Sequence, residues 1–174
     1  MKSAILPAGL TTISDGLFSG CKALASIDIP DGVTEIESEA FLDCVALESV
    51  VFPAKLKTIC KFAFKNCASL KSVVFREGLE TIGDGAFHKC ASLTSIVLPN
   101  GLETIGLGAF YDCDSLKSAT LPATVCENGP HAFPKVATVY LQNGEILQKP
   151  AKPKKRSAKR KTRDAKVKSR SDGQ

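Results

Sequence analysis

Cysteine is the residue with the widest chemical range in this 174-residue chain, because a thiolate can bind zinc, form a disulfide or attack a substrate. Five of the seven cysteines recur every 23 residues, at Cys21, Cys44, Cys67, Cys90 and Cys113. A zinc site needs four converging ligands, commonly supplied by C-x₂-C pairs, and the sequence holds no such pair. The even spacing instead predicts a column of small buried thiols, about 4.8 Å apart, that stay reduced. Cys60 and Cys126 lie off this column, and nothing near them indicates reactivity.

The other residue types that support catalysis are sparse. His88 and His131 are the only histidines, neither lies in a motif, and the spacing places them two repeat units apart, so we expect that they do not meet. Asp112 and Asp114 flank Cys113, but calcium needs six or more oxygen ligands. The chain has no G-x-S-x-G, no H-E-x-x-H and no phosphate-binding glycine loop. We therefore expect no catalytic residue, no metal, no cofactor and no enzymatic activity.

Phenylalanine and leucine share the period of the cysteines. In five successive copies a phenylalanine is followed after three residues by cysteine and after three more by leucine, as in Phe87, Cys90 and Leu93. One such unit cannot bury its apolar side chains alone, whereas stacked units can. The sequence therefore predicts a repeat solenoid of about six coils.

The end of each unit has the pattern of a short strand. In one copy, Ile96 and Leu98 alternate with Ser95 and Val97, which predicts that the first pair points inward and the second outward. Pro99 ends the strand because proline has no N–H to donate. A second short extended piece, ending in isoleucine, and a tight turn of 3₁₀ type complete the predicted coil.

The full pattern is L-x-x-I-x-x-x-A-F-x-x-C-x-x-L-x-x-[IV]-x-[ILF]-P, and it covers roughly residues 4–141. It resembles the BspA-like leucine-rich repeats of surface antigens. The resemblance implies a right-handed solenoid with a parallel sheet on one face. It also implies an adhesion or protein-binding module, often on a microbial surface and often secreted.

The two ends of the repeat region differ. In the last copy Asn128 occupies the isoleucine position, and the segment after Phe133 is three residues shorter and lacks its cysteine, as expected of a capping unit. The first copy, with Leu6, Leu10 and Ile13, shows no such change. It predicts either a self-association face or a chain that continues upstream.

The outward positions of the strands form the candidate protein-binding face. One column is predicted at Ser26, Ser49, Ser72, Ser95 and Ser118, and a second at Asp28, Val51, Val74, Val97, Thr120 and Tyr140. Exposed valines beside hydroxyl groups are typical of an interaction site. The alternative is that β-branched residues are present because they favour strands.

The formal charge of +5 is divided unevenly along the chain. Residues 1–148 carry 11 Lys and Arg against 16 Asp and Glu, whereas residues 149–174 carry 12 against 2. We therefore expect a folded domain over 1–148 and a disordered basic tail over 149–174. The candidate targeting or nucleic-acid-binding residues of the tail are Lys152, Lys154, Lys155, Arg156, Lys159, Arg160, Lys161 and Arg163.

These features favour a non-enzymatic adaptor or adhesion module that binds a protein through its sheet face, with a tail that tethers or targets it. One alternative is a nucleic-acid-associated protein that binds the phosphate backbone through the tail, and another is a fragment of a secreted adhesin. Neither a signal peptide nor a stretch of about 18 apolar residues is evident, so the expected location is the cytoplasm or nucleus, or the cell surface for a fragment.

A salt titration separates the interpretations of the tail. If the tail binds phosphates, the affinity of the full chain for DNA or RNA falls steeply as salt rises, because binding releases counterions, and deleting residues 149–174 abolishes it. If the tail only solubilises the domain, the full chain shows no binding even at low salt. Electrophoretic mobility shifts at several salt concentrations, with the truncated chain as control, distinguish the two.

Overall fold

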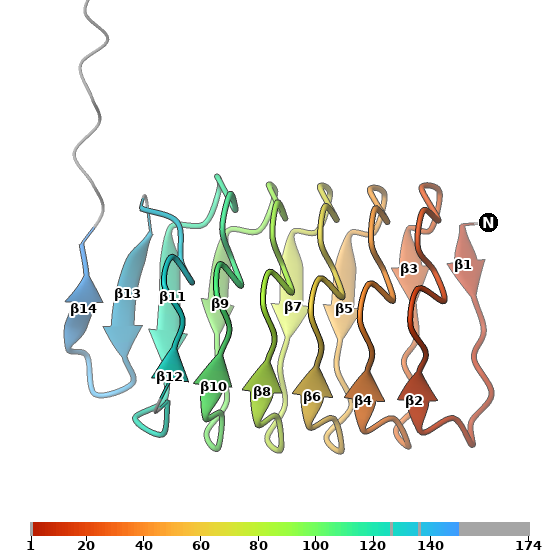
Figure 1. Cartoon of the computed structure of the whole chain (residues 1–174), viewed down its shortest axis with the longest axis horizontal. Coiled ribbons are helices and arrows are strands. Elements are labelled where there is room, and N and C mark those ends of the chain that lie inside the picture. Colours follow the sequence, from red (N-terminus) through yellow and green to blue (C-terminus); the bar gives the residue numbers. More distant parts are fainter. Residues whose placement is uncertain (1, 126, 136, 150–174) are drawn as a thin grey trace, which may run out of the picture.

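The computed structural model describes residues 2–125, 127–135 and 137–149, so Cys126 and the tail from residue 150 onward lie outside it. The described residues form a row of stacked coils that starts at β1 (Ser3–Ala4) and ends at β14 (Ile146–Gln148), as Figure 1 shows. Within these ranges every regular element is a β-strand. The predicted solenoid of about six coils is confirmed.

One long face of the solenoid carries a continuous sheet of six strands, which we call the front sheet (Figure 1). Its strands are β2 (Thr12–Ile13), β4 (Glu35–Ile36), β6 (Thr58–Ile59), β8 (Thr81–Ile82), β10 (Thr104–Ile105) and β12 (Glu127–Asn128). Neighbouring strands are parallel, and each residue pairs with the one 23 positions later, as Ile36 does with Ile59. The second extended piece of each repeat therefore forms a sheet of its own, in addition to the sheet that the sequence predicts.

The opposite long face, the back face, holds eight strands in the described part of the chain, and the six between the first and the last of them include or adjoin the residues that were predicted to bind. They are β1, β3 (Ser26–Ile27), β5 (Ser49–Val51), β7 (Ser72–Val74), β9 (Ser95–Val97), β11 (Ser118–Leu121), β13 (Thr138–Leu141) and β14. They pair in three separate groups, β1–β3, β5–β7 and β9–β11–β13–β14, rather than as one sheet. The back face is thus interrupted on both sides of the β5–β7 pair.

Two phenylalanines distinguish the middle pair of strands from its neighbours. Phe52 and Phe75 follow β5 and β7 at the position where the coils on either side have Ile29 and Leu98. The two rings contact each other, with centroids 5.4 Å apart. Because protein interiors are closely packed, a ring in place of an aliphatic side chain must displace the backbone around it. We attribute the pairing of β5 with β7, rather than with the flanking strands, to this pair of rings.

A column of stacked phenylalanines runs along the core. Successive rings are nearly parallel, and their centroids lie 4.8 to 5.5 Å apart. The members are Phe18, Phe41, Phe64, Phe87, Phe110 and Phe133. Each of the four inner rings is thus covered by a ring of the coil before it and a ring of the coil after it, as stacking of a repeat requires.

The turn beside this column, the corner segment of each coil, divides its backbone hydrogen bonds between two directions. Phe41 N–H donates to the Ala63 carbonyl of the next coil over 2.7 Å, and Leu42 N–H donates back to Glu39 over 2.9 Å. In the same way, Asp43 N–H donates to Lys65 of the next coil, and Cys44 N–H donates back to Phe41. One bond therefore joins neighbouring coils while the next, of 3₁₀ type, holds the local turn that the sequence predicts.

The C-terminal coil ends in a reversal of the chain. β14 pairs with β13 antiparallel, although every other strand pair in the described ranges is parallel. The Gln148 side-chain amide donates to the Pro134 and Ala137 carbonyls, over 2.9 and 3.1 Å. This hairpin covers the outer edge of β13, in keeping with the capping role expected of the degraded last repeat.

The cysteines form the column that their spacing predicts, and each buried thiol has a defined partner. Cys44, Cys67, Cys90 and Cys113 are fully buried, whereas Cys21, in the first coil, is partly exposed. Each buried thiol donates a hydrogen bond of 3.1 to 3.3 Å to the phenylalanine carbonyl 26 residues earlier, as Cys67 does to Phe41. Cysteine thus fills a small apolar position and also satisfies a backbone carbonyl.

Burial makes these thiols poor nucleophiles, because the thiolate is the reactive form. Burial raises the pKa of the Cys44 thiol to about 12 and raises the pKa values of Cys67 and Cys90 as well. Cys60 lies off the column and is partly exposed. Burial, and next the Glu35 carboxylate that its Sγ contacts at 3.4 Å, raise its pKa to about 11.

Removing one ring from the phenylalanine column should destabilise the fold strongly. Phe64 is fully buried and stacks on Phe41 and Phe87. We expect Phe64→Ala to lower the free energy of unfolding by about 3–5 kcal/mol in urea denaturation. Leu17→Ala, at a side chain that is 49% exposed, is the control and should change it by no more than about 0.5 kcal/mol. Similar losses in the two variants would contradict the stacked core.

The buried thiols should make the fold sensitive to alkali. A cysteine in the unfolded chain ionises around its ordinary pKa of 9.0, whereas folded Cys44 stays protonated until about pH 12. Its stabilising contribution is therefore complete below pH 9 and is lost as pH rises from there toward 12. We expect the free energy of unfolding to fall across this window, and to fall less steeply in Cys44→Ala. Equal slopes in the two proteins would show that the thiol does not contribute.

Candidate functional site

The back face presents both predicted columns to solvent, so the geometry behind the prediction is confirmed while binding itself remains a prediction. Ile96 and Leu98 are buried, and Ser95 and Val97 between them are exposed, as the alternation predicts. The exposed members are Ser26, Asp28, Ser49, Val51, Ser72, Val74, Ser95 and Val97. The members nearer the C-terminus, Ser118, Thr120 and Tyr140, are partly buried.

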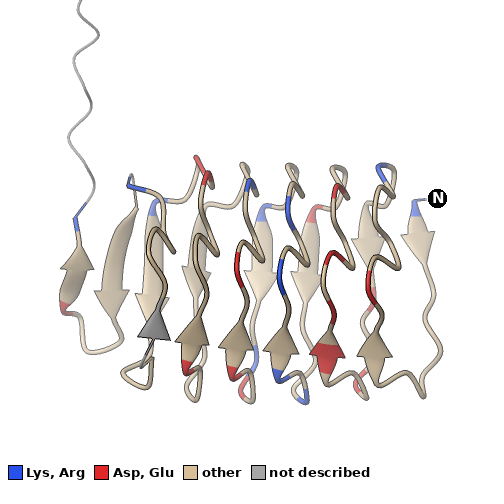
Figure 2. Ribbon diagram, viewed as in Figure 1, with Lys and Arg blue, Asp and Glu red and all other residues tan. Residues whose placement is uncertain are grey.

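Three valines form the most apolar part of this face, and we call them the valine row. Val51, Val74 and Val97 lie on the successive strands β5, β7 and β9, with 50%, 47% and 65% of their surface exposed. The six central strands of the back face, β3 to β13, contain no charged residue, and Figure 2 shows the charges mainly on turns and corners. Depletion of charge is a property of the centre of protein–protein interfaces.

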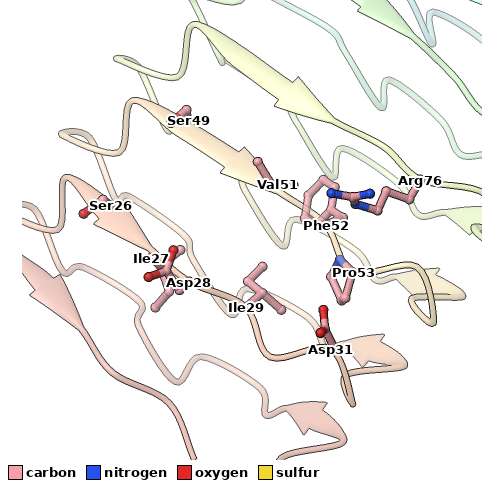
Figure 3. Close-up of a pocket in the computed structure, with 10 residues that line it drawn as sticks. All are labelled: Ser26, Ile27, Asp28, Ile29, Asp31, Ser49, Val51, Phe52, Pro53 and Arg76. Atoms are coloured by element: carbon pink, nitrogen blue, oxygen red, sulfur yellow. The ribbon is translucent and has the colours of Figure 1, made fainter. Parts of the chain in front are cut away.

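A hollow lies at each interruption of the back face, next to the valine row. The first, between β3 and β5, has a volume of about 300 Å³ and is bordered by Asp28, Asp31, Val51 and Arg76 (Figure 3). The acidic groups lie on the β3 side, and Arg76 extends from the opposite side (Figure 3). The second hollow, between β7 and β9, has a volume of about 410 Å³ and includes Val74 and Val97. Neither hollow is among the features that the repeat pattern predicts.

An ion pair borders the same face. Lys71 Nζ lies 2.9 Å from Glu48 Oε2, one coil away, and both side chains are largely exposed. Their hydrogen bond lowers the pKa of the Glu48 carboxyl below its ordinary value. A pair this exposed contributes little to stability. The two residues directly precede Ser49 and Ser72, so the ion pair lies at the rim of the back face, next to the serine column.

The corner segments of the last four coils enclose a third hollow, which the repeat pattern also does not predict. It has a volume of about 400 Å³, and its walls include Phe62, His88, Tyr111 and His131; we call it the corner hollow. The two histidines do not touch each other, as expected, but Tyr111 lies between them, with ring centroids 5.6 Å from His88 and 6.3 Å from His131. The signal was present in the sequence, because Tyr111 lies 23 residues after His88.

His88 is held in its neutral form at neutral pH. Partial burial lowers its pKa below the usual value, and this outweighs the opposite effect of the Asp112 carboxylate, whose Oδ2 lies 3.9 Å from Nε2. Lys65 and Lys89 lower the pKa further. The ring therefore offers an aromatic face and one acceptor nitrogen rather than a cation.

Some of the predicted features are not tested by the described residues. Among residues 2–125, 127–135 and 137–149, no group of three or more His, Cys, Asp or Glu is placed to hold a metal ion. The same part of the chain has no helix long and apolar enough to cross a membrane. The candidate residues of the basic tail, Lys152 to Arg163, lie outside it. Tail-mediated nucleic-acid binding, self-association through the first coil and lack of enzymatic activity all remain predictions.

Comparison with known proteins identifies the repeat. A family profile for the BspA type leucine rich repeat region matches residues 1–93 and 80–148, in six copies. The crystal structure of a T. pallidum leucine rich repeat protein is 30% identical, with a TM-score of 0.67, and the match covers 80% of this chain and 73% of that one. A search of curated proteins gave no significant match.

Two further solved structures are similar over a smaller part of their length. A leucine-rich repeat protein from Bacteroides ovatus is 27% identical with a TM-score of 0.56, and the match covers 76% of this chain but 43% of that one. One from Eubacterium ventriosum is 26% identical with a TM-score of 0.65, covering 78% and 37%. The present chain thus spans less than half of these two relatives. Together with the profile match from residue 1 to residue 148, these similarities show that the chain belongs to the BspA type leucine-rich repeat family.

Proposed function

We propose that this chain is a non-enzymatic protein-binding module and that its partner docks on the back face, centred on the valine row. The observation that carries the proposal is the row itself: Val51, Val74 and Val97 are exposed on adjacent strands. One hollow lies beside the Val51 end of the row, and the other lies within the row, between Val74 and Val97. A partner that covers the row would remove three apolar side chains from water, and each of the two hollows could take one of its anchoring side chains.

The polar groups around the row would set orientation and specificity. Serines at 49, 72 and 95 form an exposed line of hydroxyl groups parallel to the valines, and each hydroxyl can donate or accept a hydrogen bond. At the first hollow, Asp28 and Asp31 lie across from Arg76. A partner with a basic side chain toward the aspartates and an acidic one toward Arg76 would be complementary there.

A cell-surface location is part of the same proposal, and membership of the family supports it. The sequence resembles the BspA-like repeats of surface antigens, and the family profile shows that the repeats are of this type. The comparisons give no support to the intracellular location that the sequence suggested. The chain spans 43% and 37% of two relatives, so the module would be one part of a longer binding surface in proteins of that size.

The valine row can be tested with nearly isosteric substitutions. In the triple variant Val51→Thr, Val74→Thr, Val97→Thr the strands keep β-branched residues, so folding should be unaffected. Each substitution replaces a methyl with a hydroxyl, and a methyl is worth about 0.8 kcal/mol when buried. We expect the variant to bind at least tenfold more weakly to a partner identified by photo-crosslinking from position 72, as measured by surface plasmon resonance.

Two controls make this result specific. Leu17→Thr alters an equally exposed apolar side chain outside the back face and should leave binding unchanged. Urea denaturation should give all three proteins similar stability. Full affinity in the triple variant, or equal weakening by Leu17→Thr, would refute the proposed docking face.

A further inference from the structure

The corner hollow lies away from the back face and is built differently from the two hollows there. Its floor and two of its walls come from one repeat position, which Phe62, Gly85, Gly108 and His131 occupy in four successive coils. The two glycines have no side chain, and the Phe62 ring fills the space over Gly85, so a trough is left over Gly108 between the Phe62 ring and the His131 ring. The hollow therefore exists because of a local exception to the repeat.

The backbone explains why glycine suits this position and why the two rings stand out. All four residues have a positive φ of 56° to 59°, which glycine adopts freely and a side-chain-bearing residue adopts at a cost. A Cβ atom at Gly85 would clash with the Phe62 ring, which lies directly over this glycine. Phe62 and His131 thus bear backbone strain while their rings border the trough.

A third wall comes from a neighbouring repeat position. Lys65, His88 and Tyr111 occupy it in successive coils, and the His88 and Tyr111 rings are inclined by 33° with centroids 5.6 Å apart. Leu107, 53% exposed, also lines the trough. The hollow therefore presents aromatic or aliphatic surfaces on several sides of a space of about 400 Å³, within the size range of small-molecule sites.

The charges at the hollow have one sign. Lys65 and Lys135 both line it, and Lys65 Nζ lies 4.4 Å from the Phe62 ring centroid. Among the described residues that line the hollow there is no Asp or Glu. Two carboxylates lie near the hollow without lining it: Asp84 Oδ1 accepts from Leu107 N–H at 2.7 Å, and Asp112 Oδ2 lies 3.9 Å from His88 Nε2.

We propose that the corner hollow binds a small planar aromatic anion, such as an aryl or indolyl carboxylate. The ring lies over Gly108, in contact with Phe62, His88 and Tyr111, where offset or edge-on aromatic contacts are favourable. The carboxylate meets the ammonium groups of Lys65 and Lys135, which supply charge-assisted hydrogen bonds. This activity is separate from protein binding on the back face, because the two surfaces share no residue.

The experiment compares three ligands that share one ring system. The full chain is titrated with indole-3-acetate, with its neutral amide, indole-3-acetamide, and with the cation tryptamine. The fluorescence anisotropy of the indole reports binding directly, since the chain has no tryptophan. For a ligand of this size we expect a Kd of about 1 mM or tighter for the acetate. The amide should bind at least fivefold more weakly, and tryptamine should not bind measurably.

Variants locate the site. Tyr111→Ala and the pair Lys65→Gln, Lys135→Gln should each weaken indole-3-acetate binding at least fivefold. Lys117→Gln, at an exposed lysine outside the hollow, should leave it unchanged. Unfolding midpoints verify that all variants are folded. If the double lysine variant does not fold, the single variant Lys135→Gln is measured in its place. Absence of binding, equal affinity for acetate and amide, or full binding by Tyr111→Ala would each overturn the proposal.

Discussion

The structure depends on the register between coils, because no single coil can enclose its own apolar side chains. Two interactions fix this register at 23 residues. The phenylalanine column places each ring on the next at 4.8 to 5.5 Å. The corner segments give every second N–H to the following coil, as Phe41 does to Ala63. A shift by one residue would break both at once and turn inward side chains outward, so the stack has one stable alignment.

The cysteine column follows from the same register. A position between successive phenylalanines must be small, apolar and able to donate a hydrogen bond to a carbonyl 26 residues earlier. Cysteine meets all three requirements, and burial then suppresses its ionisation. The number of cysteines suggests zinc or redox chemistry. The column cysteines are instead explained by their packing and by their hydrogen bonds to backbone carbonyls.

The features that could be predicted from the sequence are those that recur in every repeat. The features that were missed depend on residues that differ from one repeat to the next. The period alone predicts that Ile96 is buried and Val97 exposed, because each position recurs in several copies. The period does not reveal the contact between Phe52 and Phe75, since both are apolar and fit the pattern, yet it is to these rings that we attribute the separate pairing of β5 with β7. The corner hollow was missed because it depends on differences between copies at one position, glycine at 85 and 108 against aromatic rings at 62 and 131.

The contrast between the two long faces also bears on the mechanics of the molecule. The front sheet is one uninterrupted ladder from β2 to β12, whereas the back face is divided before β5 and after β7. Under a bending load, the divided face can open at two lines without breaking a strand pair, while the front sheet must stretch hydrogen bonds along its whole length. The solenoid is therefore expected to flex about its front sheet as a spine, and such flexing would widen or narrow the two hollows of the back face together.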